Sequence, residues 1–355
     1  MAAIAAAIPA ISIDLQLSDL LVSKIIPFYM VPYGIGALLY APLTRYFSYK
    51  RILGTTFIVF ALSCFYCAQA ASISQFFTGR MAMGISGASA IPLGLVIIGQ
   101  LFEKHVRGRL VGLFFGCSFA ASIVGILVGG LWHWRWLFYI PAAIGFLTGL
   151  GVTILNTEDL NKVRGVKVSY WACFQEKKIR EVFFYIFIIS FLYHGVHKWF
   201  GVYLDRIYHL DKLMIGFFFL LMSISGALGQ IGGGFISDKK GRYTACIIGL
   251  IVLSIATMLL YGQYPLFILA FVLCMVSMGW AIGHNGISTI LTDFPDERRP
   301  EIAGLNSSVR FISGGIGFSI SSLFVGKSFG VTFLVIGILM LLSVGVINKV
   351  VPKKS

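Results

Sequence analysis

The chain has 355 residues, of which 58% are apolar and only 12% are charged. Soluble domains carry roughly 25% charged residues, so this composition excludes an ordinary soluble protein and favours a polytopic membrane protein. The formal net charge is +14, but the basic residues lie in short segments between apolar runs, so nucleic acid is not an expected partner. We expect them instead to face the anionic leaflet of a lipid bilayer.

A membrane-spanning helix needs about 20 mostly apolar residues. The chain opens with a shorter apolar piece, MAAIAAAIPAI, and then contains eleven runs of sufficient length. They cover residues 20–43, 51–72, 75–102, 108–131, 134–155, 181–204, 212–236, 243–263, 265–292, 302–326 and 329–349.

The longest polar stretch lies between the fifth and sixth full runs, at residues 156–180. It carries six Lys and Arg residues beside several aromatic ones. We predict that this stretch links a helix bundle at 1–155 to a second bundle at 181–355. Part of the linker is expected to lie on the membrane as an amphipathic helix.

Loop charge indicates the orientation, because Lys and Arg accumulate on the cytoplasmic side of membrane proteins. Twenty Lys and Arg residues lie in one set of alternate loops, which includes the linker and the C-terminal tail, and only five lie in the other set. The linker and the C-terminus are therefore predicted to be cytoplasmic, in a plasma or inner membrane.

Two charged segments of the first half have counterparts in the second half. Residues 36–51 align with 229–244 at an offset of 193, and residues 102–113 align with 294–305 at an offset of 192. Internal repeats of this kind are typical of transporter folds. The chain is therefore predicted to be a membrane carrier built from a duplicated bundle of helices.

The same offset bears on the short opening segment. Moving the run 181–204 back by 193 positions predicts a first helix that begins before Met1 and ends near Ile11. The eleven residues present rise about 16 Å, less than a hydrocarbon core of about 30 Å. We therefore expect an incomplete first transmembrane helix that results from a truncated or misassigned start. A native half-helix is the alternative.

Several short patterns resemble those of a known family. The segment GALGQIGGGFISDKKGR is a glycine-rich helix end that runs into a charged turn, Arg80 and Gly84 have the spacing R-x-x-x-G, and WRW at 134–136 opens an apolar run. Together they resemble the major facilitator superfamily, particularly its drug and metabolite efflux branch. The resemblance implies an all-α membrane protein with two six-helix bundles related by pseudo-two-fold symmetry, a small-molecule substrate and a monomeric state.

The charged turn of the second half is a candidate gating element. Gly229 lies on the glycine-rich ridge, which allows close helix packing. It is followed by the turn that contains Asp238, Gly241 and Arg242. Asp238 is expected to face a helix N-terminus or to pair with Arg242. A plain charged turn without a gating role is the alternative.

The first-half counterpart of this turn has Arg45 where the second half has Asp238. A cation is repelled by a helix N-terminus. Either Arg45 forms a rebuilt latch with a carboxylate such as Asp293, Asp296 or Glu301, or the first half has lost its latch.

Charged and polar groups inside the apolar runs are candidates for substrate binding or coupling, because Arg or Lys at a helix centre costs about 2.5–3.5 kcal/mol on insertion scales. These candidates are Arg80, His194, His197, Lys198, His284, Asn285, Asn306 and Arg310. His194, His197 and Lys198 are predicted to share one broad helical face because of their spacing. Arg80 has an alternative explanation as a side chain that reaches the membrane surface, and His284 has one as a structural hydrogen-bonding group.

All fourteen carboxylates lie in loops or at the ends of the apolar runs. None is therefore predicted at mid-membrane, where it would carry a proton or bind a cationic solute. Histidine, with an ordinary pKa of about 6.5, suits proton coupling instead. A basic interior also favours an anionic substrate.

The sequence shows no P-loop, and no catalytic-triad or metal-ligand spacing in it rises above chance, so an enzyme, an ATP-driven pump, a cofactor and a metal site are not expected. The leading hypothesis is a secondary active transporter of a small organic solute that works by alternating access, with proton-coupled efflux or exchange. One alternative is uptake of an anionic metabolite. Another, from a different class, is a non-transporting membrane sensor or degenerate remnant.

Overall fold

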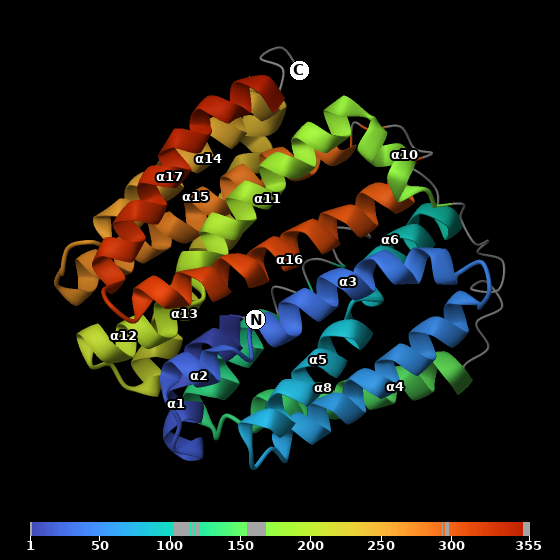
Figure 1. Cartoon of the computed structure of the whole chain (residues 1–355), viewed down its shortest axis with the longest axis horizontal. Helices are drawn as coiled ribbons and strands as arrows, with labels where there is room; N and C mark the ends of the chain where they lie inside the picture. Colours follow the sequence, from blue (N-terminus) through green and yellow to red (C-terminus); the bar gives the residue numbers. More distant parts are fainter. Residues whose placement is uncertain are drawn as a thin grey trace.

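The computed structural model describes residues 2–102, 114, 117, 121–154, 168–292, 294 and 298–350, and every regular element in this part is a helix (Figure 1). In chain order the helices are α1 (Ala2–Leu15), α2 (Asp19–Ser23), α3 (Pro27–Leu43), α4 (Tyr49–Ala68), α5 (Ile73–Gly87), α6 (Ala90–Leu101), α8 (Trp136–Ile154), α10 (Tyr170–Gln175), α11 (Lys177–His197), α12 (Phe200–Tyr208), α13 (Lys212–Lys240), α14 (Arg242–Leu259), α15 (Leu266–Thr292), α16 (Arg299–Val325) and α17 (Phe329–Val350). A further apolar helix covers Ala121–Leu131.

Ten stretches in the described part are long and apolar enough to cross a membrane, and they coincide with ten of the eleven predicted runs. Of the remaining run, 108–131, the structure describes residues 114, 117 and 121–131, and the rest lies outside the described residues. The run at 20–43 is divided into α2 and α3, with Pro27 as the first residue of α3. Proline lacks a backbone N–H and is favoured at this position of a helix.

Four helices begin at a side chain that caps their free backbone N–H groups. Ser18, Ser48, Ser72 and Asp211 each accept a hydrogen bond from the N–H three residues further on, at the starts of α2, α4, α5 and α13. Such a cap typically contributes about 1 kcal/mol. The apolar runs therefore have defined starting points where polar residues interrupt them.

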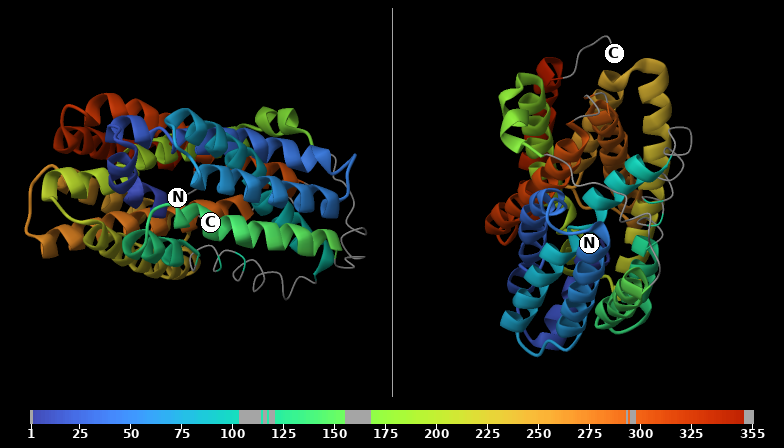
Figure 2. Two further views of the ribbon diagram at one scale, coloured as in Figure 1. Left: turned by 90° about the horizontal axis from the view of Figure 1, so that it is seen from below. Right: turned by 90° about the vertical axis from the view of Figure 1, so that its right-hand side faces the viewer.

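The helices form two groups that meet along α3 and α16 (Figure 1). In the first group α3 and α4 pack against α5, and α4 also packs against α8. In the second group α15 lies between α13 and α14, and α11 packs against α16 and α17. The opening helix α1 packs against α12 and α13 of the second group. The long helices of both groups run in roughly the same direction (Figure 2).

The WRW motif ties the first group together at the end of the bundle opposite the linker. Trp134 Nε1 donates a hydrogen bond to Asp14 Oδ2 (3.0 Å), and an Arg135 nitrogen lies 3.3 Å from the same oxygen. Another Arg135 nitrogen donates to the carbonyls of Ala68 and Ala70 at the end of α4 (2.7 and 3.0 Å). The motif therefore connects α1, α4 and the start of α8.

Helices α14 and α15 approach each other closely through glycine. A methyl group added to Gly249 would collide with the backbone of Gly283 and lie 2.8 Å from the carbonyl of Gly279. Gly232 of α13, in contrast, has nothing within 4 Å of an added methyl group. Small residues at such crossings let membrane helices gain van der Waals contact.

We expect Gly249→Leu to destabilise the protein by about 3 kcal/mol or more, because the colliding atoms belong to the backbone of α15 and have no room to move. Gly232→Leu is the matched control and should change stability by about 0.5 kcal/mol or less. Thermal unfolding in detergent, followed by gel filtration of the heated protein, measures both. Equal stability of the two variants would contradict the close packing of α14 and α15.

Candidate functional site

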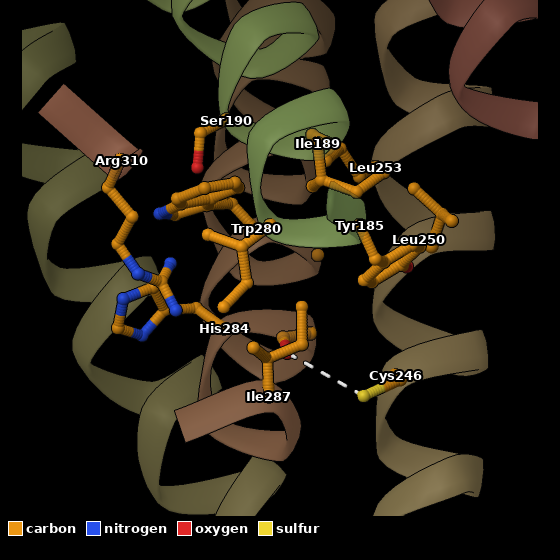
Figure 3. Close-up of a pocket in the computed structure, with 13 residues that line it drawn as sticks. Tyr185, Ile189, Ser190, Cys246, Leu250, Leu253, Trp280, His284, Ile287 and Arg310 are labelled. Atoms are coloured by element: carbon orange, nitrogen blue, oxygen red, sulfur yellow. Dashed lines mark hydrogen bonds between the residues drawn. The ribbon is translucent and has the colours of Figure 1, made fainter. Parts of the chain in front are cut away.

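A small cavity lies between α11, α14 and α15, with Arg310 of α16 at its edge (Figure 3). Its volume is about 20 Å³, which is room for about one water molecule. The lining residues are Tyr185, Ile186, Ile189, Ser190, Cys246, Leu250, Leu253, Gly279, Trp280, Gly283, His284, Ile287 and Arg310. In this structure the cavity is therefore too small for an organic solute.

The guanidinium of Arg310 is the strongest charge at this cavity. Its Nε donates a hydrogen bond to Asn306 Oδ1 one turn earlier on α16 (2.6 Å). Its Nη2 atom is buried and has no hydrogen-bond partner. The ion pairs among the described residues do not include Arg310, and its side chain points toward His284 (Figure 3).

A chain of polar groups continues from His284 to α13. His284 Nδ1 lies 3.4 Å from Gln230 Nε2 and 3.4 Å from Ser288 Oγ. Asn285 Nδ2 donates to the backbone carbonyl of Gln230 (3.3 Å), while its Oδ1 is buried without a partner. Gln230 therefore connects α13 to the two polar residues that the sequence singles out on α15.

An aromatic wall separates the cavity from the histidines of α11. The indole of Trp280 stacks on Tyr193 with ring centroids 3.8 Å apart and planes at 4°. The rings of His194 and His284 lie 5.9 and 5.7 Å from Trp280. Trp280 therefore presents a flat apolar surface next to both imidazole rings.

The three ionisable residues near the end of α11 occupy different surroundings. His194 faces α16, where its ring lies against Gly314. His197 stacks on Tyr193 (4.9 Å between centroids) within an aromatic cluster, and Lys198 caps the end of α11 with only 5% of its surface exposed. Of the three, His194 is the residue whose ring contacts Trp280, which lines the cavity.

Arg80 of α5 lies in the first group of helices, away from this cavity. Its Nε donates a hydrogen bond to the carbonyl of Ile25 (3.1 Å), and its guanidinium lies 4.3 Å from the ring centroid of Tyr29. Only 2% of Arg80 is exposed. Its side chain therefore does not extend to the membrane surface, and its contacts hold α5 against α3.

Several buried polar atoms of this region have no hydrogen-bond partner. They are Ser190 Oγ, His194 Nδ1, His197 Nδ1, Asn285 Oδ1 and Arg310 Nη2. Buried polar atoms in folded proteins are nearly always paired with protein or water. A group of unpaired atoms on α11, α15 and α16 indicates a place where water or a polar ligand binds.

Sequence reasoning did not single out Trp280, Tyr193, Gln230 or Ser190. Aromatic residues inside an apolar run have the same pattern whether they face lipid or a site. Gln230 offered a usable signal, because it is an amide within the glycine-rich run of α13.

The second-half residues predicted to act in gating lie where α13 meets α14 and α15. An added methyl group on Gly229 would lie 2.8 Å from the carbonyl of Met278, so this glycine allows close packing on α15. Gly241 has φ of 87° and separates α13 from α14, which begins at Arg242. The side chain of Asp238 lies outside the described part, so its pairing with Arg242 stays a prediction.

Arg45 is exposed in the turn after α3. Of its predicted partners, Asp293 and Asp296 lie outside the described residues. Glu301 is 2% exposed and accepts a hydrogen bond from the backbone N–H of Ser169 in the linker (2.9 Å). The described interaction of Glu301 is therefore with the linker.

The linker helix α10 packs against both groups of helices, near the end of α3 and the start of α16. Tyr170 Oη donates to the carbonyl of Leu38 on α3 (3.1 Å) and lies beside Gly304 of α16. Burial raises the pKa of the Tyr170 phenol, and the nearby Glu301 raises it further. Trp171 and Phe174 remain exposed, as expected for a helix that rests on a membrane surface.

Membrane-length helices in two groups, with unpaired polar atoms close to the helices where the groups meet, are found in membrane transporters. Within the described residues, no group of three or more His, Cys, Asp or Glu side chains is arranged to hold a metal ion. The chain belongs to the Major Facilitator Superfamily, whose sequence profile matches residues 1–318. This finding confirms the family resemblance and the all-helical membrane fold.

Known relatives fit this assignment. The chain is 25% identical over 290 residues to the uncharacterized MFS-type transporter YwfA of Bacillus subtilis, covering 78% of this chain and 70% of that protein. It is 24% identical over 330 residues to the bicyclomycin resistance protein homolog of Haemophilus influenzae, covering 85% and 80% of the two chains. Its fold is similar to that of a bacterial homolog of the human lysosomal transporter Spinster (TM-score 0.77, 15% identity, 98% of this chain and 92% of that chain). The protein is therefore a multi-pass membrane transporter, in a family and fold of transporters rather than enzymes.

Proposed function

We propose that the protein is a secondary active transporter that moves a small organic anion across the membrane. Alternating access arises from rocking of the bundle at 1–155 against the bundle at 181–355, with 156–180 as a cytoplasmic linker. The protein acts as a monomer without a cofactor, with its C-terminus in the cytoplasm of the cell. The observation that carries the proposal is the unpaired Nη2 atom of Arg310 at the cavity.

The preference for an anion follows from the charges around Arg310. A buried charge without a counter-charge is costly, and Asn306 supplies only a neutral acceptor. A carboxylate or sulfonate accepts two N–H bonds from a guanidinium and supplies the missing charge. The flat face of Trp280 beside it suits an aromatic or other planar body.

Export in exchange for protons is the proposed direction, supported by the similarity to the bicyclomycin resistance protein homolog. Uptake of the anion together with a proton is the second candidate, and the chemistry of the site supports it. A proton on His194 or His284 adds positive charge beside Arg310, so that proton and anion attract each other and bind together.

Purified protein in liposomes tests the proposal with benzenesulfonate, which stays ionised at all relevant pH values. Benzenesulfonamide serves as the neutral control of the same shape. We expect protein-dependent movement of the anion and none of the amide. With the anion trapped inside the liposomes, an acidic exterior should drive its exit if the protein exchanges anion for protons. An acidic interior should drive its exit if proton and anion are transported together. Failure to distinguish the two solutes would contradict an anion site at Arg310.

A further inference from the structure

The two groups of helices also meet at the end of the bundle opposite the linker. There the backbone of Ala5 in α1 contacts Gly201 of α12 so closely that a methyl group on this glycine would collide with it. Leu20 of α2 reaches Gly326 at the end of α16, at 3.4 Å from an added methyl group. Ala5 has no exposed surface, so this end is closed in the structure.

Within the described part of the chain, an ion pair crosses this closed interface. Arg206 Nε of α12 donates to Asp19 Oδ2 at the start of α2 (2.6 Å). The side chain of Asp19 is 7% exposed and that of Arg206 is 60% exposed. The pair therefore joins a buried carboxylate of the first half to a partly solvated guanidinium of the second half.

Asp19 has little else to balance its charge. Its second oxygen, Oδ1, is buried without a hydrogen-bond partner. Asp14 of α1 is bound to Trp134 and Arg135. On the opposite side, Asp211 caps the start of α13. Removal of Arg206 would therefore leave a buried carboxylate without a counter-charge, a costly arrangement.

We propose that the Asp19–Arg206 pair is the latch that holds this end of the transporter shut, independently of which solute is carried. The latch has two stable arrangements. In one, the carboxylate is dry and paired with Arg206; in the other, the helices have separated and water hydrates it. A dry, unpaired carboxylate lies between them and is disfavoured, so the end is either closed or open.

The latch borders a space that solvent can enter. An open pocket of about 510 Å³ borders the pair. Its lining residues are Pro9, Ile13, Asp19, Asp205, Arg206, His209, Leu210 and Asp211. A small separation of α2 from α12 is therefore enough to hydrate Asp19. The pocket also supplies further charged and titratable neighbours, namely Asp205 and His209 of α12.

The latch is tested by the reactivity of a thiol placed in the closed interface. Ala5→Cys, in a background with the six native cysteines changed to serine, is labelled with a bulky maleimide in purified protein. The labelling rate reports the population in which this end is open. We expect Asp19→Asn and Arg206→Gln each to raise the rate about tenfold, which corresponds to about 1.4 kcal/mol.

Two controls separate the latch from a general effect of charge. Asp205 Oδ2 lies 3.5 Å from the same Arg206 nitrogen but belongs to the same helix, so Asp205→Asn should leave the rate unchanged. Arg206→Lys keeps the charge at an exposed position and should stay near the parental rate. Gel filtration of each variant reports folding, and Arg206→Gln tests the latch even if Asp19→Asn does not fold.

Parental labelling rates in both Asp19→Asn and Arg206→Gln would overturn the proposal. So would an equal increase in Asp205→Asn, because that residue does not cross the interface. Transport of benzenesulfonate is not part of this measurement, so failure of the latch and failure of the anion site are distinguishable.

Discussion

Substituting Arg310 with methionine is expected to weaken binding of benzenesulfonate strongly while making the empty protein slightly more stable. The loss of a buried charge partner typically costs about 2 kcal/mol or more in binding, so the affinity should fall by about 30-fold or more. At the same time the unpaired Nη2 atom disappears, and replacing an uncompensated charge by an apolar group is often stabilising, here by about 1 kcal/mol. Titration calorimetry and thermal unfolding in detergent measure the two effects.

Arg80→Met is the matched control for this prediction. It removes a second arginine from a membrane helix, but Arg80 already donates to the carbonyl of Ile25 and lies over the ring of Tyr29. A hydrogen bond from a charged group contributes about 1.5–3 kcal/mol, so Arg80→Met should lower stability and leave the anion affinity of the folded protein within about threefold of the parent. If Arg310→Met is destabilised like Arg80→Met and still binds the anion, Arg310 is a structural residue.

The sequence alone could not show that Arg80 and Arg310 have different surroundings. Both interrupt an apolar run in the same way, and the spacing of Arg310 from Asn306 suggested only a polar spot. Their surroundings differ because Arg80 meets a backbone carbonyl that α2 leaves free near its end, whereas Arg310 meets a cavity. Which carbonyl or ring lies opposite a side chain depends on helix packing, and the order of residues within one helix does not determine it.

The membrane-length helices themselves could be predicted, because each apolar run must be long enough to cross the bilayer and must end in polar residues. Divisions inside the runs were harder to place. The boundary between α2 and α3 has a signal in Pro27, but α5 and α6 are separated at Ala88 and Ser89, where neither residue forbids a helix.

Asp19 shows a different limit of sequence reasoning. It comes directly after Ser18, the cap of α2, so its position at a helix end agrees with the prediction that the carboxylates lie in loops or at the ends of the apolar runs. Its burial results from α12, which is nearly two hundred residues further along the chain and covers it with Arg206. The sequence showed the position along the helix, and the packing of the two halves supplied the partner.

Replacing His194 with glutamine is expected to uncouple transport from the pH gradient. His194 touches the Trp280 wall through a ring contact of 5.9 Å, and its Nδ1 atom is buried without a partner. The charged and titratable groups that face it are His197 and Lys198 of α11, His284 of α15 and Arg310 of α16. In the co-transport candidate, a proton gained by His194 on the acidic side adds to the positive charge that holds the anion, so glutamine should remove this gain in affinity at low pH.

The measurement is movement of benzenesulfonate into or out of liposomes under a pH gradient. It is compared with the exchange of benzenesulfonate for benzenesulfonate across the membrane when no pH gradient is present. His194→Gln should lower the gradient-driven movement about tenfold and leave the exchange rate within about twofold, as expected if one interaction of about 1.4 kcal/mol is lost. His197→Gln is the control: it removes the same ring from the same helix, but this ring stacks on Tyr193 and has no ring contact with Trp280 among the described residues. That variant should lose about 0.5–1.5 kcal/mol of stability and keep the pH dependence of the parent. If His194→Gln keeps it as well, the proton is carried by another group, and His284 becomes the residue to test because it lies against both Gln230 and the Arg310 side of the cavity.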